Sequence, residues 1–271
     1  MHRSWLTFAA LSLLAGCGYS ETGRLTATLL TSTCSWNGQE YLGVADFRVA
    51  LEYTPTKLAN RELPAVGTCN KQTYLFAEEA PISGGADIPK LDGAPAWSAQ
   101  RHSGSLTNTE PGLYFDDVLG DAPGGCATPE EVVTEGVQLD HAGLFSGVVS
   151  PTPSPLGIVK IDGVRDDQWS GEVGYGKAMT VSWDENSWDE TFVQVRQING
   201  LNVLDVVTCN TTGTTSLAMD SAFWSDVDNM GTTKLEVYVG FQNIDAVQGT
   251  KGEALQTITR VAHVLKAPPP E

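Results

Sequence analysis

Hydrophobic and polar residues alternate along much of the chain. In residues 24–34, for example, Leu25, Ala27 and Leu29 share one face of an extended chain, and mainly threonines share the other. Side chains of a strand alternate between its two faces, so this pattern predicts a half-buried strand. In the first half of the chain the same pattern predicts strands at residues 24–34, 46–53, 71–77 and 112–118, with a turn at 36–39.

The β pattern is stronger in the C-terminal half. Seven short segments there are separated by turn residues, and seven strands over about 110 residues are enough for an immunoglobulin-like or fibronectin-like sandwich. We therefore predict an all-β chain, with such a sandwich in the C-terminal half and a second, irregular β domain before it. The predicted strands of the sandwich are residues 157–161, 178–183, 191–198, 201–209, 214–219, 234–242 and 257–265.

A proline-rich stretch at residues 150–156 is the predicted domain boundary. Its three alternating prolines remove backbone donors and favour an extended connector. The prediction is an N-terminal β domain with long loops at 24–149 and the sandwich at 157–267; the alternative is an edge-strand crossing inside one domain. Residues 78–140 are rich in Gly, Pro, Asp and Ser, and contain either functional loops or elements that the pattern does not reveal. Within them, a helical period at 129–139 predicts one short helix.

Two consecutive strands of the C-terminal half have a pattern that is known from another family. Residues 179–183 (MTVSW) are followed by 192–196 (FVQVR), and this pair resembles fibronectin type III domains, in which a strand ending in Trp precedes the next strand. The resemblance covers about residues 157–266. It implies a sandwich with Trp183 in its core, but it implies no activity, because a fold does not carry function. The chain departs from antibody-type domains, since it lacks a second cysteine placed for the intersheet bridge.

The first seventeen residues have the pattern of an export signal. His2 and Arg3 form a short basic start, residues 5–15 are apolar, and Leu14-Ala15-Gly16-Cys17 follows. The apolar run is too short to span a bilayer, which needs roughly 20 residues. The ending resembles the lipobox of bacterial lipoprotein signals. The alternatives are an ordinary cleaved signal with a chance cysteine, or an uncleaved start.

The lipobox resemblance implies a membrane anchor. Residues 1–16 would be removed as a signal peptide, Cys17 would be acylated and become the N-terminus, and residues 17–23 would form a short tether. Several acyl chains give a durable anchor where one chain is marginal. Gly18 stands where the family's inner-membrane retention signal has Asp, so we expect the outer membrane, on its periplasmic or surface-exposed side.

The charge balance is strongly acidic. The chain has 16 Lys and Arg against 33 Asp and Glu, a formal net charge of −17. If residues 1–16 are removed, Arg3 is lost and 15 basic residues remain against 33 acidic ones, so the formal net charge becomes −18. Nucleic acid is therefore not expected as a partner, because its phosphates require clusters of basic residues. The acidic surface keeps the protein dispersed or, as the alternative, binds cations.

The five cysteines are consistent with lipidation and disulfide bonds. With Cys17 assigned to lipid, Cys34, Cys69, Cys126 and Cys209 remain, which suggests two disulfides in an oxidising compartment. Three connectivities are possible, and spacing along the chain favours Cys34–Cys69 and Cys126–Cys209. A zinc site is disfavoured, because there is no Cys-x-x-Cys pair and the histidines lie far from the cysteines in sequence.

No catalytic constellation is recognisable in the sequence. Ser146 stands one position late for a Gly-x-Ser-x-Gly elbow. His102, His141 and His263 lie far apart; His141, beside Asp140, is the least implausible general base, and His263 is expected to be an ordinary strand side chain. We therefore expect a non-enzymatic protein with a binding or interaction role. The alternative is a hydrolase of unknown substrate built on residues 78–140 with His141.

Acidic loops provide the only candidate metal site, and no other cofactor is expected. Asp226, Asp228 and Gly231 match three positions of an EF-hand loop, but the required fifth and twelfth ligands are missing. A solvated loop is expected here, as at the acidic turns 116–121 and 184–190; the alternative is weak calcium binding through Asp226, Asp228 and Asn229.

Tryptophans in turn-rich segments suggest a possible ligand. Exposed rings can stack on sugars or form interaction hot spots, so a carbohydrate-binding or adhesive surface module is an alternative function, with a glycan or an envelope protein as partner. The competing interpretation is that these rings pack over the ends of a sandwich. The candidates are Trp36, Trp97, Trp188 and Trp224.

Overall fold

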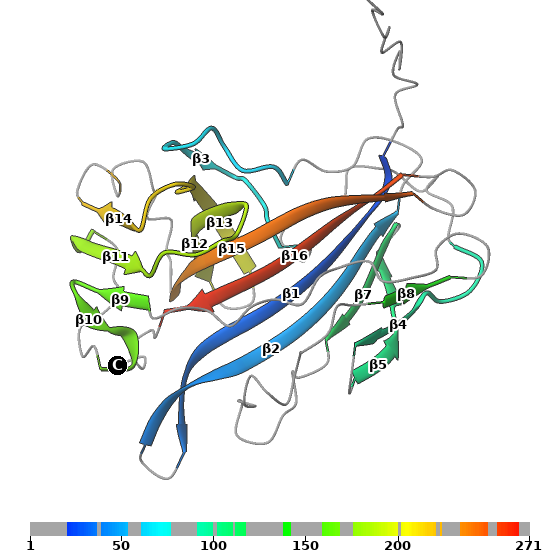
Figure 1. Ribbon diagram of the computed structural model, residues 1–271, viewed down its shortest axis with the longest axis horizontal. Helices are drawn as coiled ribbons and strands as arrows, with labels where there is room; N and C mark the ends of the chain where they lie inside the picture. Colours follow the sequence, from blue (N-terminus) through cyan, green and yellow to red (C-terminus); the bar gives the residue numbers. More distant parts are fainter. Residues whose placement is uncertain are drawn as a thin grey trace, which may run out of the picture.

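The computed structural model describes residues 21–36, 39–53, 61–76, 91–99, 102–110, 112–117, 138–141, 159–168, 176–199, 202–220, 223, 234–248 and 254–265. These residues confirm the predicted all-β class, since strands dominate and three sheets form (Figure 1). The elements are β1 (Glu21–Trp36), β2 (Gln39–Tyr53), β3 (Cys69–Lys71), β4 (Ala96–Ala99), β5 (His102–Ser105), β6 (Thr107–Glu110), β7 (Leu113–Asp117), β8 (Gln138–Asp140), β9 (Val159–Ile161), β10 (Val164–Arg165), the 3-10 helix η1 (Asp166–Gln168), β11 (Met179–Trp183), β12 (Glu190–Asn199), β13 (Asn202–Asn210), β14 (Ser216–Met219), β15 (Lys234–Gln248) and β16 (Ala254–Val264).

A nine-stranded sheet forms the centre of the molecule, with the order β3-β13-β12-β15-β16-β1-β2-β7-β6. The long strands β1, β2, β15 and β16 run side by side across it (Figure 1). β1 and β2 pair antiparallel as far as Trp36↔Gln39, at the predicted turn. β1 also pairs in parallel with β16, from Glu21↔Ala254 to Ser32↔Val264.

The pairing of β1 with β16 corrects the predicted division into two domains. β1 belongs to the predicted N-terminal domain and β16 to the predicted sandwich, yet they are neighbours in one sheet. Strands of both halves also contribute to a single hydrophobic cluster. The proposed connector at 150–156 lies outside the described residues. The prediction failed because an alternating pattern shows which face of a strand is buried and not which strand lies beside it.

A four-stranded sheet with the order β10-β9-β11-β14 packs on one part of the central sheet. Asp162 and Gly163, both with positive φ, make the two-residue turn between β9 and β10. Trp183 on β11 is buried and meets Phe241 on β15 edge-on, with ring centroids 6.3 Å apart, so its predicted place in a core is confirmed. The C-terminal strands are thus divided between two facing sheets, and their assignment to the fibronectin type stays a prediction.

A three-stranded sheet, β5-β4-β8, covers another part of the same face. Trp97 on β4 packs against Phe47 on β2 at 5.8 Å between ring centroids. β8 begins at Gln138, so the helix predicted over 129–139 is wrong at its C-terminal end, and its remainder lies outside the described residues. The strand predicted at 71–77 is also displaced, since β3 ends at Lys71 and residues 73–76 are irregular.

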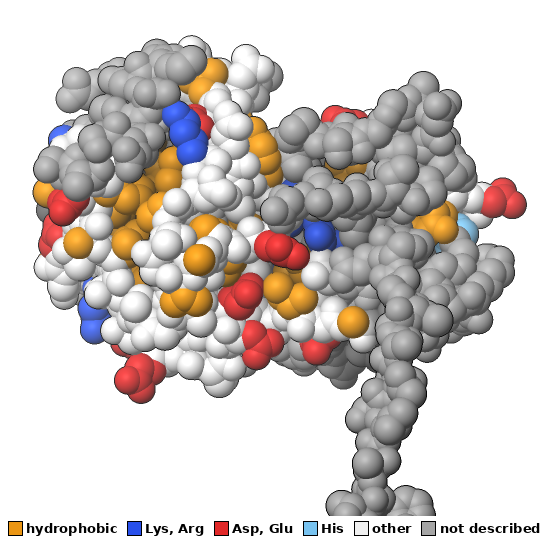
Figure 2. Space-filling model, turned by 90° about the horizontal axis from the view of Figure 1, so that it is seen from above, with side chains coloured by type: hydrophobic (Ala, Val, Ile, Leu, Met, Phe, Trp, Pro, Cys, Tyr) orange, Lys and Arg blue, Asp and Glu red, His pale blue; other side chains and the backbone are white. Residues whose placement is uncertain are grey.

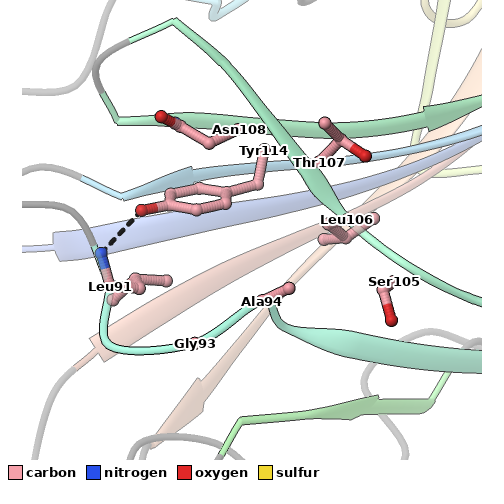
Figure 3. Close-up of a pocket in the computed structure, with 8 residues that line it drawn as sticks. All are labelled: Leu91, Gly93, Ala94, Ser105, Leu106, Thr107, Asn108 and Tyr114. Atoms are coloured by element: carbon pink, nitrogen blue, oxygen red, sulfur yellow. Dashed lines mark hydrogen bonds between the residues drawn. The ribbon is translucent and has the colours of Figure 1, made fainter.

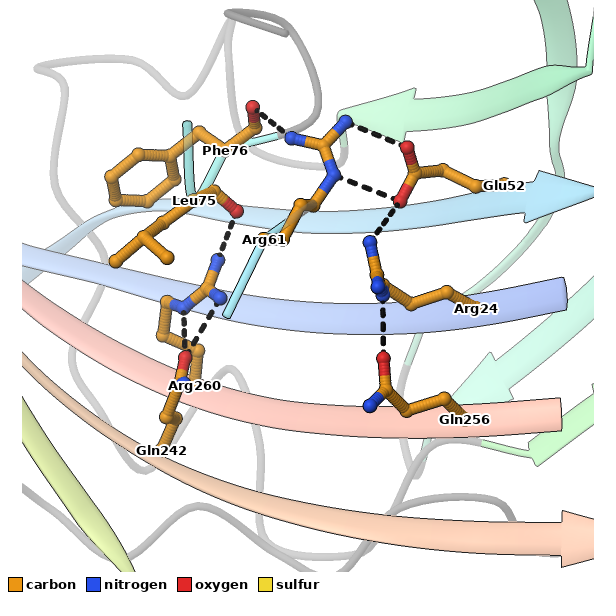
Figure 4. Close-up of polar contacts among 8 residues, drawn as sticks. All are labelled: Arg24, Glu52, Arg61, Leu75, Phe76, Gln242, Gln256 and Arg260. Carbon is orange, nitrogen blue, oxygen red and sulfur yellow. Dashed lines mark hydrogen bonds and ion pairs between the residues drawn. The ribbon is translucent and has the colours of Figure 1, made fainter. Parts of the chain in front are cut away.

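The opposite face of the central sheet is also buried, and it combines polar side chains with a second hydrophobic cluster of Leu30, Leu75, Phe76, Phe192, Tyr238 and Ala262. Residues 61–76, which we call the strap, include the edge strand β3, and the residues after it lie on this face, where the carbonyl of Leu75 (Figure 4) and that of Thr73 accept hydrogen bonds from side chains of the sheet. Arg61 reaches both carboxylate oxygens of Glu52, at 2.7 and 2.8 Å, and Arg24 donates to the same carboxylate at 3.2 Å. Arg260 donates to the side chain of Gln242 and to the carbonyl of Leu75 in the strap. We call Arg24, Glu52, Arg61, Gln242 and Arg260 the buried charge layer.

A disulfide between Cys69 and Cys209 ties the strap to β13. The two residues are opposite each other in the β3–β13 pairing, with Cα atoms 3.9 Å apart. This bond overturns the favoured connectivity, which paired Cys69 with Cys34 and Cys209 with Cys126. Spacing along the chain misled the prediction, because the sheet brings together cysteines 140 residues apart. The side chain of Cys34 and all of Cys126 lie outside the described residues.

Candidate functional site

A cavity of about 410 Å³ lies between the segment that leads into β4 and the β6–β7 hairpin (Figure 3). It falls within residues 78–140, where the sequence indicated either functional loops or overlooked elements. The β6–β7 pairing and the short β5 hold the two sides of the cavity in place. It is lined by Leu91, Gly93, Ala94, Ser105, Leu106, Thr107, Asn108 and Tyr114.

Tyr114 is the most constrained polar group of the cavity. β7 pairs with β2 at Leu51↔Tyr114, and the tyrosine is only 3% exposed. Its hydroxyl oxygen accepts a hydrogen bond from the backbone N–H of Leu91 at 2.6 Å, as Figure 3 shows. The contact joins β7 to the opposite wall, so the hydroxyl has a defined position.

Asn108 is held by its own hairpin. Its amide nitrogen donates to the carbonyls of Glu110, at 2.7 Å, and Leu113, at 3.0 Å. The side chain therefore closes the β6–β7 connection, and its amide oxygen is the acceptor that it can still offer. Ser105 and Thr107 are exposed and are the hydroxyl-bearing residues of the lining besides Tyr114 that the structure describes.

His141, the candidate general base, supports the cavity without lining it. Its Nε2 lies 3.1 Å from the backbone oxygen of Asp92, in the segment that forms one wall. A carbonyl oxygen can only accept, so Nε2 carries the proton in this contact. Nδ1 is buried and has no hydrogen-bond partner among the described residues. His141 is thus suited to positioning the wall at Asp92.

His263 takes part in an arrangement that the sequence did not reveal. Its Nε2 lies 2.8 Å from Asp166 Oδ2, and its Nδ1 lies 3.2 Å from the Thr31 hydroxyl. The order hydroxyl, imidazole, carboxylate is that of a catalytic triad. However, Thr31, His263 and Asp166 are buried, and none of them lines the cavity beside Tyr114. The contact instead links β1 and β16 to η1; His263 is confirmed as a strand side chain.

The tryptophan candidates are only partly placed by the structure. Trp97 is 2% exposed and donates from Nε1 to Asp116 Oδ2 at 2.8 Å, so the prediction of an exposed binding ring is wrong for it. It is buried because its own sheet, β5-β4-β8, packs against β2 at this point. Trp188 is half-buried and packs against the main hydrophobic cluster. The side chain of Trp36 and all of Trp224 lie outside the described residues.

The acidic candidates do not form a metal centre within the part of the chain that the structure describes. No group of three His, Cys, Asp or Glu side chains there could hold a metal ion. Asp226, Asp228 and Asn229 fall outside that part. Asp184 is exposed and lies 4.0 Å from Lys160, as expected for a solvated turn.

Comparison with known proteins finds no match: no protein family, curated protein or solved structure is detectably similar to this chain. None of the described residues forms a helix that is long and apolar enough to cross a membrane.

Proposed function

We propose that this chain is a lipid-anchored protein of the bacterial cell envelope, attached to the outer membrane through Cys17, whose folded body binds a ligand without catalysis. The observation that carries export is the Cys69–Cys209 disulfide. Disulfides persist in oxidising compartments and are rare in the cytosol. A stable cross-strand bond therefore fits the export signal that residues 1–17 resemble.

The position of β1 supports attachment close to the membrane. β1 begins at Glu21, which is 21 − 17 = 4 residues after Cys17. Four extended residues reach at most about 14 Å. The folded body of an acylated protein would therefore lie near the bilayer surface, with the first residues of β1 and β16 and the last residues of β2 at its near end.

The surface charge favours acyl chains over electrostatic docking. The formal net charge is −17. On the face seen in Figure 2, acidic side chains of the described residues are spread singly, and the basic ones are few and separate. Such a surface would be repelled by anionic headgroups, so a covalent lipid is the better anchor.

The binding role rests on the cavity beside Tyr114. The described residues that line it include no charged side chain and no histidine. The two described histidines with known contacts are instead committed to Asp92 and to Asp166 and Thr31. A preformed recess with uncharged walls is suited to holding a small molecule.

Replacement of Cys17 tests the anchor. We expect Cys17→Ser to move the protein from the membrane fraction to the soluble fraction and to abolish labelling with radioactive palmitate, whereas Ser20→Ala, three residues away, should change neither. Continued tight membrane association of Cys17→Ser would contradict the anchor.

A further inference from the structure

We infer that the cavity beside Tyr114 binds a neutral saccharide unit. This inference rests on the proposed non-catalytic binding role and gives it a ligand class. It moves the site of sugar recognition away from the loop tryptophans, since Trp97 is buried in the core.

The first argument is charge. The eight described residues that line the cavity are all uncharged at neutral pH. A charged ligand would lose hydration on entering this recess and would meet no opposite charge among these eight residues, which costs several kcal/mol. The lining therefore selects against phosphate, carboxylate and ammonium groups, in a protein whose net charge of −17 repels anions as well.

The second argument is the mixture of surfaces. Leu91, Ala94 and Leu106 give the cavity apolar walls, and Ser105 and Thr107 are hydroxyl-bearing residues of its lining (Figure 3). A pyranose ring has a matching division, with C–H groups on its faces and hydroxyl groups around its edge. The volume of about 410 Å³ lies within the range of about 300–1,000 Å³ that small-molecule sites span.

The third argument is the hydroxyl of Tyr114. Its oxygen accepts the Leu91 N–H, but its own proton has no acceptor among the described residues, although the side chain is 97% buried. A buried tyrosine O–H usually finds a partner. A ligand that carries hydroxyl or ring oxygen atoms would supply the missing acceptor, whereas a hydrocarbon chain would not.

The fourth argument is rigidity. Asn108 is held by two hydrogen bonds to its hairpin, and His141 holds the carbonyl of Asp92 beside the opposite wall. Walls that are already positioned lose little conformational entropy when a ligand binds. A weak, specific saccharide site needs this property, because its few hydrogen bonds leave little free energy for reorganisation.

Saturation-transfer NMR and calorimetry on the detergent-solubilised full chain test the inference, with maltose, cellobiose and N,N′-diacetylchitobiose as probes and a detergent that has no sugar headgroup. We expect at least one probe to bind with a Kd of about 1 mM. Ala94→Trp, which fills the recess from an exposed position, should abolish binding. Ser105→Ala with Thr107→Val should weaken it about tenfold, as should Tyr114→Phe.

Matched controls lie outside the cavity. Ser103→Ala, on the same strand as Ser105, and Thr180→Val, on β11, remove exposed hydroxyl groups and should leave the Kd unchanged. Failure of all three saccharides to bind at 10 Kd, about 10 mM by the same estimate, would overturn the inference. Binding that survives Ala94→Trp, or binding of 1-decanol in place of sugars, would overturn it as well. The lipid anchor is tested separately, by the membrane fractionation of Cys17→Ser. The anchor and the saccharide site can therefore be contradicted independently of each other.

Discussion

The two faces of the central sheet are both buried, but by different chemistry. One face is apolar, and the β9–β11–β14 and β4–β5–β8 sheets cover it with Trp183 and Trp97. The other carries the buried charge layer beside a smaller hydrophobic cluster, and it lies under the strap. The comparison shows that alternation in the sequence marked the apolar face correctly, whereas the charged face had the pattern of a solvent-exposed surface.

The charged face can be buried because its polar groups have partners. Glu52 receives hydrogen bonds from Arg24 and Arg61, and the strap carbonyls of Leu75 and Phe76 accept from Arg260 and Arg61. Unpartnered charges in such a place would cost several kcal/mol each. The strap therefore covers this face with carbonyl acceptors and also with the apolar side chains of Leu75 and Phe76.

The largest expected effect comes from the carboxylate that two arginines share. Glu52→Gln should lower the free energy of unfolding by about 4 kcal/mol, because removing one partner of a buried ion pair leaves charge uncompensated. Denaturant titration measures the change, and Glu185→Gln, an exposed acidic residue, is the control with an expected change within about 0.5 kcal/mol. If the two substitutions changed the free energy of unfolding equally, the buried charge layer would be solvated, and the two faces of the sheet would not differ in the way described.

A substitution on the apolar face gives the reference value. Leu25 is fully buried on β1, next to Arg24, which points to the other face. Leu25→Ala should cost about 3 kcal/mol through lost burial and the cavity left behind, and Leu204→Ala, at a largely exposed leucine, less than about 1 kcal/mol. If Leu25→Ala were as mild as Leu204→Ala in the same titration, the apolar face would not be close-packed.

The smallest effect concerns Tyr238, which lies under the strap. Its hydroxyl accepts from Arg196 at 2.7 Å and donates to Glu236 at 2.6 Å. Burial raises the pKa of Tyr238 above its ordinary value of 10.0, Arg196 lowers it and Glu236 raises it further. The folded state therefore favours the neutral phenol, and this contribution to stability is complete below about pH 10 and is lost as the pH rises above it.

Tyr238→Phe should cost about 1 kcal/mol at pH 7, the value of a typical net hydrogen bond. Above about pH 10 the unfolding free energy of the wild type should fall more steeply than that of Tyr238→Phe. Denaturant titrations from pH 7 to about 11 compare the slopes, with Tyr74→Phe as the half-buried control. Parallel profiles for wild type and Tyr238→Phe would show that this phenol titrates as freely as in the unfolded chain.

The alternating pattern predicted some strands with the wrong length and missed others. Residues 46–53 were predicted as a strand, but β2 begins at Gln39, because Ser35↔Glu40 and neighbouring pairs with β1 extend it. In the cavity region, 112–118 correctly indicated β7, while β4, β5 and β6 were missed. These strands have four residues each, too few for an alternating pattern to stand out.

The sequence by itself determined the all-β class and the apolar face of the long strands, because each depends on residues close together in the chain. The core position of Trp183 was implied by the resemblance to fibronectin type III domains. Only the tertiary structure decided the β1–β16 pairing, the Cys69–Cys209 bond and the contact of Arg24 with Gln256, residues that are 232 positions apart. It also brought Tyr114 to Leu91 across the cavity. The physical reason is that alternation specifies which way a side chain points, while the strand beside it is selected by packing and pairing over the whole chain.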